Sequence, residues 1–463
     1  MLNPKKNKYL KTYSSILVIS LLSGCASETS TKSPIKNTEK TYTEYTEPVV
    51  TISKKAEGST ISLQDAANLV ISYHPRVAQA ISNEKGEEEM INVAKANYYP
   101  QVKGGMSYGY QNDSRENSNS VAKNINLEVQ QTLYDFGKTS NTVKSAEYGY
   151  QSAKINTDAT HEKLIHEATR SVIESVRYQK LIVLAKEQAK QVSSLVGLIE
   201  DRQEKGASNL SDVLHVRARL DEVQSEELDS MAQYQTQLQN LSFLIGKPVT
   251  QGTSIADLPQ ELNQACSMPI DWNNIPDYVI ADIEAKRAVA DLELSIAEEK
   301  PNIYATGTLA HDLDKDDNPR YKSRTESKIS LNFSMPIYQG GGLAAKKRAS
   351  ENRSYAAAAR KEEIKLGINQ VMSDSAIRLQ SMISRQELLI QRVSNLKGTR
   401  DLYKKQYLDL GTRSLVDLLN SEQEFHRAQV EVENNKLNII QTKLDCAFYH
   451  GKLDEYFNAT STR

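Results

Sequence analysis

The chain has 463 residues, and its 57 Lys and Arg against 59 Asp and Glu give a net charge of −2, without the basic excess typical of nucleic-acid binding. The mean hydropathy of −0.56 excludes a polytopic helical membrane protein. The 3 cysteines are too few for a disulfide scaffold and argue against a cysteine-rich zinc module.

The N-terminus has the pattern of an export signal. Four lysines precede a short apolar run, Ile16 to Leu22, which is too short to span a bilayer as a helix. The run ends in Leu22-Ser23-Gly24-Cys25, which resembles the bacterial lipoprotein signal, and Ala26 after it favours the outer membrane. We therefore expect a lipoprotein signal peptide over 1–25, lipidation at Cys25, and a flexible linker over 26–60. An ordinary signal peptide with a chance cysteine is the alternative.

Two halves of the chain repeat each other at a nearly constant offset. The offset is 201 residues at paired prolines, 204 at the glycines after the predicted strands, and 205 at later glycines and aspartates. The pairs are Pro75 and Pro276, Pro100 and Pro301, Gly137 and Gly341, Gly206 and Gly411, and Asp212 and Asp417. We interpret this as a tandem duplication with repeats at 61–260 and 261–463.

Each repeat begins with a predicted helix and continues into two alternating segments. The helices are expected from Leu63 to about Tyr98 and from about Tyr278 to Glu299. The alternating segments are typical of strands with one apolar and one polar face. The positions that share the less polar face are every second residue from Val102 to Tyr110, Ile125 to Val129 with Leu133, Ile303 to Leu309 and Ile329 to Ile337.

Two explanations of these strands compete. In a soluble sheet the apolar face would cover a protein core, whereas in a transmembrane barrel it would face lipid. The strand lengths and the export signal favour the barrel. Four strands cannot close a barrel alone, so that interpretation requires an oligomer.

Long proline-free tracts follow each pair of strands. We predict antiparallel helices from Lys138 to Lys205 and Leu210 to Ile245, joined by a turn at Gly206, and again from Leu343 to Leu410 and Ser414 to about Tyr449, joined at Gly411. Their narrow apolar stripes are typical of coiled coils.

This combination of features resembles the TolC family of bacterial outer-membrane channel-tunnels. The most specific stretches are Asn97 to Pro100, Gln131 to Gly137, Met335 to Gly341 and Leu410 to Leu419. The resemblance implies a mainly α fold with a β-barrel part, in which each repeat is a β-hairpin plus long antiparallel coiled-coil helices. It also implies a homotrimer with a 12-stranded outer-membrane barrel and a periplasmic α-helical barrel, served by a periplasmic adaptor and an inner-membrane pump.

The resemblance also implies roles for residues at the turns. In TolC-like proteins an Arg after the turn glycine ties neighbouring helices together, and carboxylates one and two turns later form an acidic ring. Together these residues form the periplasmic gate of the family. Arg413 and Asp417 match them, but Asn420 stands where relatives often carry a second Asp. An i,i+4 surface pair is the plainer interpretation of Arg413 and Asp417. Asp212 and Arg217 are expected to serve packing or adaptor docking.

No residue pattern predicts chemistry, a cofactor or a metal site. His161 and His166 are five residues apart and do not share a helix face, and the acidic run from Asp312 to Asn318 lacks the glycine and glutamate of a calcium loop. Nothing in the sequence brings Cys266 and Cys446 together, so we expect free buried thiols, although an oxidising periplasm would permit a disulfide. The chain is not expected to be an enzyme.

The leading function is therefore passive export across the outer membrane, with two cargo classes open. Protein export in a type I secretion system, with an ABC transporter, is favoured by the stretches at 97–100 and 131–137. Efflux of drugs with a proton-driven pump is the alternative, and lipidation is commoner in that branch. From another class, a surface-anchored coiled-coil structural protein would explain the anchor and the helices but not the strands.

Overall fold

A computed structural model describes residues 60–113, 118–250, 252–313 and 325–458. All described residues belong to one unit, which begins after residue 52. Cys25, the signal peptide and nearly all of the predicted linker therefore lie outside the described residues. No helix in the described ranges is long and apolar enough to cross a membrane.

The first predicted helix is two helices. α2 (Leu63–Tyr73) begins in a capping box formed by Ser62 and Asp65, and α3 (Pro75–Lys95) follows after His74, with η1 (Ala96–Tyr98) at its end. Pro75 is the reason for the break, because proline lacks a backbone N–H and forces the residue before it into an extended conformation. His74 has φ −69° and ψ 129° accordingly. The single helix expected over 63–98 was wrong in this respect.

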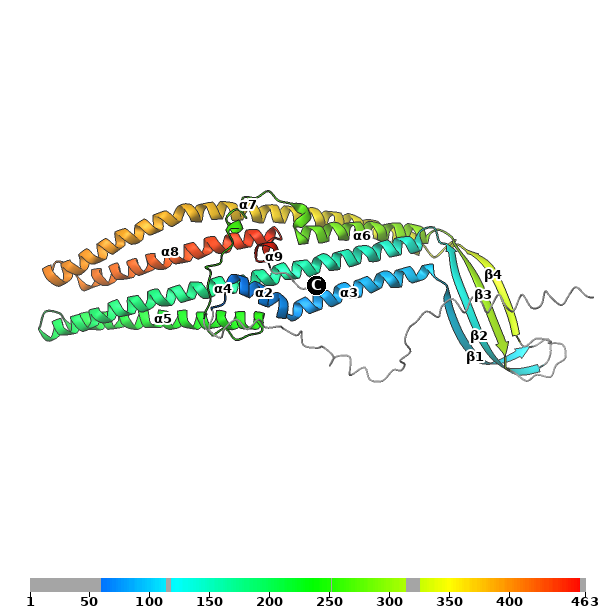
Figure 1. The fold of residues 1–463 in the computed structure, drawn as a ribbon, viewed down its shortest axis with the longest axis horizontal. Helices are drawn as coiled ribbons and strands as arrows, with labels where there is room; N and C mark the ends of the chain where they lie inside the picture. Colours follow the sequence, from blue (N-terminus) through cyan, green and yellow to red (C-terminus); the bar gives the residue numbers. More distant parts are fainter. Residues whose placement is uncertain (1–59, 114–117, 251, 314–324, 459–463) are drawn as a thin grey trace, which may run out of the picture. The chain divides into compact units, whose positions relative to one another are not determined.

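Strands from both halves of the chain form one antiparallel sheet. β1 (Gln101–Asp113), β2 (Ser118–Tyr134), β3 (Asn302–Asp312) and β4 (Thr325–Ser334) are hydrogen-bonded in the order β1-β2-β3-β4. Figure 1 shows these strands continuing from the ends of the helices. The sheet thus unites two hairpins whose first residues, Gln101 and Asn302, are 201 residues apart in the chain.

The register confirms that the alternating residues share one face. Directly paired residues lie on the same face of a sheet, and Val102 pairs with Val129, Leu127 with Leu309, and Ile303 with Phe333. Side chains of this face stay open to solvent, with Ile329 90% and Leu331 71% exposed. β4 ends at Ser334, before Pro336, so the predicted extension to Ile337 was wrong, since proline cannot donate to the ladder.

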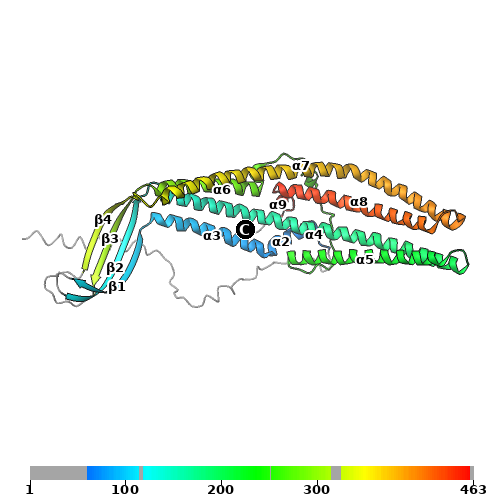
Figure 2. The same ribbon diagram turned by 180° about the vertical axis from the view of Figure 1, so that it is seen from behind.

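The helices form two long antiparallel pairs, which lie side by side in both views (Figures 1 and 2). α4 (Lys138–Glu204) pairs with α5 (Leu210–Ile245), and α7 (Gly342–Lys405) pairs with α8 (Leu415–Tyr449). α6 (Pro276–Glu298) packs on α4 and α7. Short elements complete the fold: η2 (Gln260–Asn263), η3 (Trp272–Asn274) and α9 (Leu453–Tyr456).

Apolar side chains gather at two places along these helices. The larger cluster joins α2 to the middle of α4, to the C-terminal ends of α5 and α8, and to the segment between the repeats, with Leu164, Ile173 and Leu444 fully buried. The smaller cluster lies beside the two turns and joins residues of all four long helices. Between these places the helices meet along narrow stripes, as the sequence predicts.

Candidate functional site: the paired helix turns

The turn between α4 and α5 has glycine where the chain reverses. Gly206 has φ +75°, a left-handed conformation that glycine adopts without steric cost, and Ala207 N–H donates to the Arg202 carbonyl at 2.7 Å. The side chain of Asn209 then caps α5 by accepting the Asp212 N–H at 2.9 Å. The repeated Gly and Asp are therefore explained first by the chemistry of ending one helix and starting the next.

The turn between α7 and α8 repeats this arrangement with one difference. Gly411 has φ +63°, and Ser414 Oγ accepts the Asp417 N–H at 3.1 Å. The last turn before the glycine, η4 (Gln406–Leu410), is π-helical, whereas α4 is α-helical to Glu204. The α-helix predicted up to Leu410 is therefore wrong in its last turn, because a π turn takes up one extra residue.

The two turns are joined by polar contacts that sequence reasoning missed. Arg202 of α4 donates to the Leu408 carbonyl at 3.3 Å, and its guanidinium lies 5.3 Å from the Tyr407 ring centre. Ser208, in the first turn, lies 3.3 Å from the Tyr407 hydroxyl. Tyr407 is buried, so its ring also contributes to packing at the turn. We call this set the turn joint: Arg202, Ser208, Tyr407 and Leu408.

The predicted gate residues lie outside the turn joint. Arg413 and Asp417 form an i,i+4 pair at 3.8 Å, and both side chains are exposed, at 41% and 44%. Arg413 also donates to Gln406 at 3.1 Å and lies over the Tyr403 ring, 4.4 Å from its centre. In the described chain these polar contacts of Arg413 all stay within its own turn. The plainer interpretation of the pair is thus present in the structure.

The residues of the first turn are placed differently. Asp212 lies in the first turn of α5, where the helix dipole favours a carboxylate. Arg217 pairs with Glu200 of α4 at 2.5 Å, on the exposed side of the helix pair. Neither residue meets Arg413 or Asp417 in the contacts of the described chain.

A charged layer lies further along the helices from the turn joint. Glu422 of α8 is buried beside Arg400 of α7, and burial raises the pKa of its carboxyl. His426, one turn on, is also buried, and burial together with the Arg219 charge lowers its pKa to about 4. The Arg400 guanidinium covers Phe425 at 4.3 Å from the ring centre. This layer connects α5, α7 and α8 by charge as well as by apolar packing.

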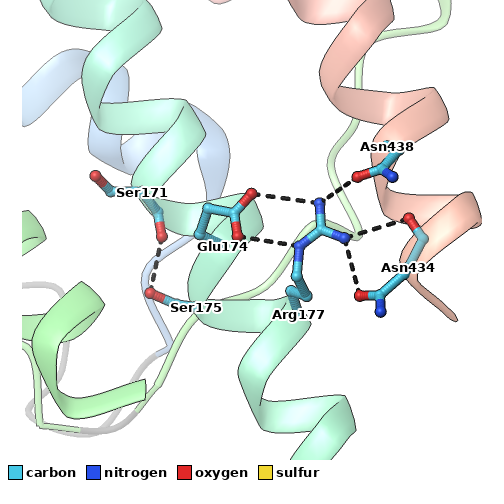
Figure 3. Close-up of polar contacts among 6 residues, drawn as sticks. All are labelled: Ser171, Glu174, Ser175, Arg177, Asn434 and Asn438. Atoms are coloured by element: carbon cyan, nitrogen blue, oxygen red, sulfur yellow. Dashed lines mark hydrogen bonds and ion pairs between the residues drawn. The ribbon is translucent and has the colours of Figure 1, made fainter. Parts of the chain in front are cut away.

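A second polar set joins the two halves of the chain (Figure 3). Arg177 of α4 donates to both carboxylate oxygens of Glu174, at 3.0 and 3.3 Å, to Asn434 at 3.1 Å and to Asn438 at 2.8 Å. Arg177 is 8% exposed, so its charge is held by partners rather than water. The sequence carries a signal for this set, because the two asparagines are i,i+4 on one helix face.

The expectation of free thiols at Cys266 and Cys446 was wrong. The two residues form a disulfide, with Cα atoms 5.1 Å apart, which ties the segment between the repeats to α8. Their separation of 180 residues hides this proximity from sequence reasoning. The side chain of His166 contacts α8, with Nε2 2.7 Å from Asp445. Within the described ranges, no group of His, Cys, Asp or Glu is arranged to hold a metal.

Long antiparallel helix pairs that continue into a sheet with an exposed apolar face are the arrangement expected of an outer-membrane channel. The family model described as outer membrane efflux protein matches residues 66–247 and 274–451. The chain belongs to this family, which is the family of TolC, and its place is the outer membrane.

Individual relatives agree with this assignment. Outer membrane protein TolC of Escherichia coli (strain K12) is 22% identical over 430 residues, covering 85% of this chain and 84% of TolC. The alkaline protease secretion protein AprF of Pseudomonas aeruginosa is 22% identical over 419 residues, covering 85% of both chains. The crystal structure of the Campylobacter jejuni CmeC outer membrane channel has a TM-score of 0.74 at 14% identity, covering 94% of this chain and 98% of that one.

Proposed function

We propose that this chain is the outer-membrane duct of a type I protein secretion system. It works as a homotrimer with a periplasmic adaptor and an inner-membrane ABC transporter. The observation that best supports a duct is the exposed apolar face of the sheet, which lies beside long helix pairs. The choice of protein as cargo is supported by the similarity to AprF, whose name is that of a secretion protein. The alternative is a small-molecule efflux duct with a proton-driven pump, which the family description favours.

The sheet supports a barrel that is built from several copies. Ile329 and Leu331 are exposed on a face that alternates with polar residues, and the described part of the chain lays nothing over them. Lipid is the environment in which such a face is stable. Three copies of a four-stranded sheet supply twelve strands, enough to close a barrel.

A comparison of the two repeats supports contact between copies. With the offset of 204 residues, Ile173 of α4 corresponds to Ile377 of α7. Ile173 is 0% exposed and Ile377 is 71% exposed. Four exposed apolar residues recur on α7 every 11 residues, which is a nearly straight line along an α-helix. We call them the α7 stripe: Tyr355, Leu366, Ile377 and Leu388.

The internal packing indicates what covers the α7 stripe. Within one chain α4 packs on α8, and Arg177 makes that contact through Asn434 and Asn438. By the repeat, α7 takes the place of α4 and α5 takes the place of α8. The α7 stripe of one copy therefore packs on α5 of the next, and repetition of this contact closes a ring.

The gate is proposed at the turns, with Arg413 and Asp417 as its charged pair. Gly206, Gly411 and Asp212 shape the turns that carry it, and the turn joint holds the turns of one chain together. The repeats at 61–260 and 261–463, the signal peptide over 1–25, the linker over 26–60 and the lipid anchor at Cys25 remain part of this proposal.

The test is deletion of the gene followed by comparison of the surface and supernatant proteomes of mutant and parent. Loss of one very large secreted protein, restored by the wild-type gene, is the expected result. An unchanged secretome together with greater drug susceptibility would favour the efflux alternative. Absence of heat-modifiable migration on gels would instead favour a surface-anchored coiled-coil structural protein.

A further inference from the structure

A glycine inside α4 makes room for charged side chains from two neighbouring helices. Gly149 is buried, and α3 and α6 lie on either side of α4 in both views (Figures 1 and 2). A Cβ atom at Gly149 would stand 2.9 Å from a Glu87 carboxylate oxygen and 3.3 Å from an Arg287 guanidinium nitrogen. Glycine weakens a helix interior, so its presence here is explained by the space that these two side chains need.

The second repeat exchanges the large and the small residue of this crossing. With the offset of 204 residues, Gly149 of α4 corresponds to Arg353 of α7. With the offset of 201 residues, Arg287 of α6 corresponds to Gly86 of α3. Arg353 and Gly86 are both exposed, and a Cβ atom at Gly86 would meet nothing within 4 Å. One chain therefore presents a bulky cation and a matching small residue on two separate surfaces.

Glu89 adds a charge to the surface of α3 that contains Gly86. It corresponds to Ala290 of α6, which is 1% exposed where α6 packs on α4. Glu89 is exposed in a single chain and accepts a hydrogen bond from the Asn92 side chain at 2.9 Å. A carboxylate that becomes covered at such a position needs a cation as its partner.

Apolar residues lie beside Glu89 on the same surface. Met90 is 50% exposed and Val93 is 60% exposed. They follow Gly86 by four and seven residues, which is the spacing of one helix face. Exposed apolar side chains at this spacing indicate a surface on which another helix packs. We call this set the α3 face: Gly86, Glu89, Met90 and Val93.

α7 carries the charge that complements the α3 face. Lys144 of α4 forms an ion pair with Glu293 of α6 at 3.5 Å. The corresponding residues are Arg348 of α7 and Asn92 of α3, the residue whose side chain donates to Glu89. Arg348 and Arg353 are both exposed, and within the described residues neither takes part in an ion pair.

We infer that the α3 face binds α7 of a second copy of this chain. Arg353 of α7 lies over Gly86 of the next copy, and Arg348 and Arg353 form ion pairs with Glu89 there. This rests on the proposed function, because it requires copies that stand side by side in a ring. Within one chain α6 packs on α4, and by the repeat α3 of the next copy takes the place of α6 while α7 takes the place of α4.

The exchange of glycine and arginine makes this contact selective. If α6 of another copy took the place of α3, Arg287 would stand against Arg353, and two guanidinium groups would repel each other. The α3 face offers Gly86 and a carboxylate at the same place. The kind of partner that fits it is therefore a helix with a protruding cation, which α7 of the same protein supplies.

The test reverses charges across the contact in the full-length protein, purified in detergent. Arg353→Glu places a like charge beside Glu89 and is expected to lower the ratio of trimer to monomer at least about tenfold. Adding Glu89→Arg restores opposite charges, so the double variant is expected to return to within about twofold of the unchanged chain. Sedimentation measures the ratio. Both positions are exposed in one chain, so the helices are expected to form, and circular dichroism checks this.

Glu88→Arg is the matched control for Glu89→Arg. Glu88 is exposed, and its counterpart on α6, Val289, is 49% exposed, so Glu88 lies away from the contact. Combined with Arg353→Glu, it is expected to leave the trimer ratio as low as Arg353→Glu alone. Equal restoration by Glu88→Arg and Glu89→Arg, or no restoration by Glu89→Arg, would overturn the inference.

A further variant tests the space instead of the charge. Gly86→Leu fills the room expected for Arg353, although a Cβ atom there meets nothing within one chain. The melting temperature of the monomer is therefore expected to stay the same or rise, while the trimer ratio falls at least about fivefold. An unchanged trimer ratio would overturn the inference.

The outcomes also separate this inference from the proposed function. A trimer ratio of Arg353→Glu equal to that of the unchanged chain overturns the inference and leaves the duct intact. Absence of trimers for the unchanged chain itself overturns both.

Discussion

At the residue scale, the turn joint shows how one guanidinium connects helices that are distant in the chain. Arg202 belongs to α4, and its side chain contacts the Leu408 carbonyl and the Tyr407 ring, which belong to the other helix pair. Its Nε is buried without an acceptor, so the side chain is held by few partners. Such weak contacts can hold the α4–α5 turn against the α7–α8 turn and still allow the two turns to separate.

We predict that Arg202→Ala opens the channel. The lost charged hydrogen bond and ring contact are together worth about 1–2 kcal/mol, which corresponds to roughly a tenfold longer open time. Conductance of single channels in planar bilayers measures this. Arg217→Ala is the matched control, because its exposed pair with Glu200 is worth less than about 1 kcal/mol and lies within one helix pair. Equal opening by both variants would contradict the prediction.

Glu162 is a buried carboxyl whose charge state affects stability. Burial raises its pKa from 4.5 to about 7, although the amides of Leu453 and Asp454 each donate to it at 2.9 Å. Its pKa is thus higher in the folded than in the unfolded chain. Between these two values the folded chain binds more protons, so this residue's contribution to stability decreases as the pH rises from about 4.5 to about 7.

We therefore predict that the wild-type chain loses stability between pH 5 and pH 8 and that Glu162→Gln loses less. The free energy involved is on the order of 2–3 kcal/mol. Urea unfolding of the detergent-solubilised protein at the two pH values measures it. The variant keeps a carbonyl acceptor for one of the two amides, so it is expected to fold. Identical pH dependence of the two proteins would show that Glu162 does not titrate in this range.

At the element scale, the π turn η4 accounts for a detail of the repeat. The offset is 204 residues at the start of the long helices and 205 after the turns, so one residue was added or lost between these points. A π turn is one way in which a helix accommodates one extra residue. The extra residue falls at Gln406–Leu410, the segment that supplies Tyr407 and Leu408 to the turn joint.

The disulfide joins the irregular segment between the repeats to the long helix α8. Cys266 lies in the segment between the repeats and Cys446 near the end of α8. We predict that Cys266→Ser with Cys446→Ser lowers the free energy of unfolding by about 2–4 kcal/mol, because the closed loop is long. Thermal unfolding measures the loss. Dithiothreitol is expected to lower the melting temperature of the wild-type chain and to leave the double variant unchanged; equal effects on both would refute the prediction.

At the scale of the whole molecule, the repeat predicts pairs of residues that meet between copies. Arg177 corresponds to Ser381 with the offset of 204, and Asn438 corresponds to Gln233 with the offset of 205. Because Arg177 bonds Asn438 within one chain, Ser381 of one copy is expected beside Gln233 of the next. Ser381→Cys with Gln233→Cys should therefore form cross-linked trimers under mild oxidation, measured on non-reducing gels.

Two controls make this cross-linking specific. Each single cysteine variant should stay uncross-linked, and Ser394→Cys with Gln233→Cys should too, because Ser394 is an exposed α7 residue on another face. Efficient cross-linking of the Ser394 pair, or none for the Ser381 pair, would refute the packing of α7 on α5 of the next copy.

Much of this architecture could be predicted from local signals. Leu210–Ile245 was predicted to the residue because Asn209 and Gly246 are typical start and stop residues. The apolar face of the sheet followed from alternation. The break at His74 could have been inferred from Pro75. The disulfide and the turn joint could not, because they depend on which helices pack together, and no local pattern records that.

The Arg177 set has a mechanical consequence for a ring of such chains. Inside a copy, the contact between α4 and α8 is strengthened by the Arg177 guanidinium, which bonds Asn434 and Asn438 of α8, whereas the equivalent position on α7 is a serine. A ring of three copies would alternate stiff seams with compliant ones. Outward pressure would separate the copies at the three contacts between α7 of one copy and α5 of the next. The structure inside each copy would stay intact.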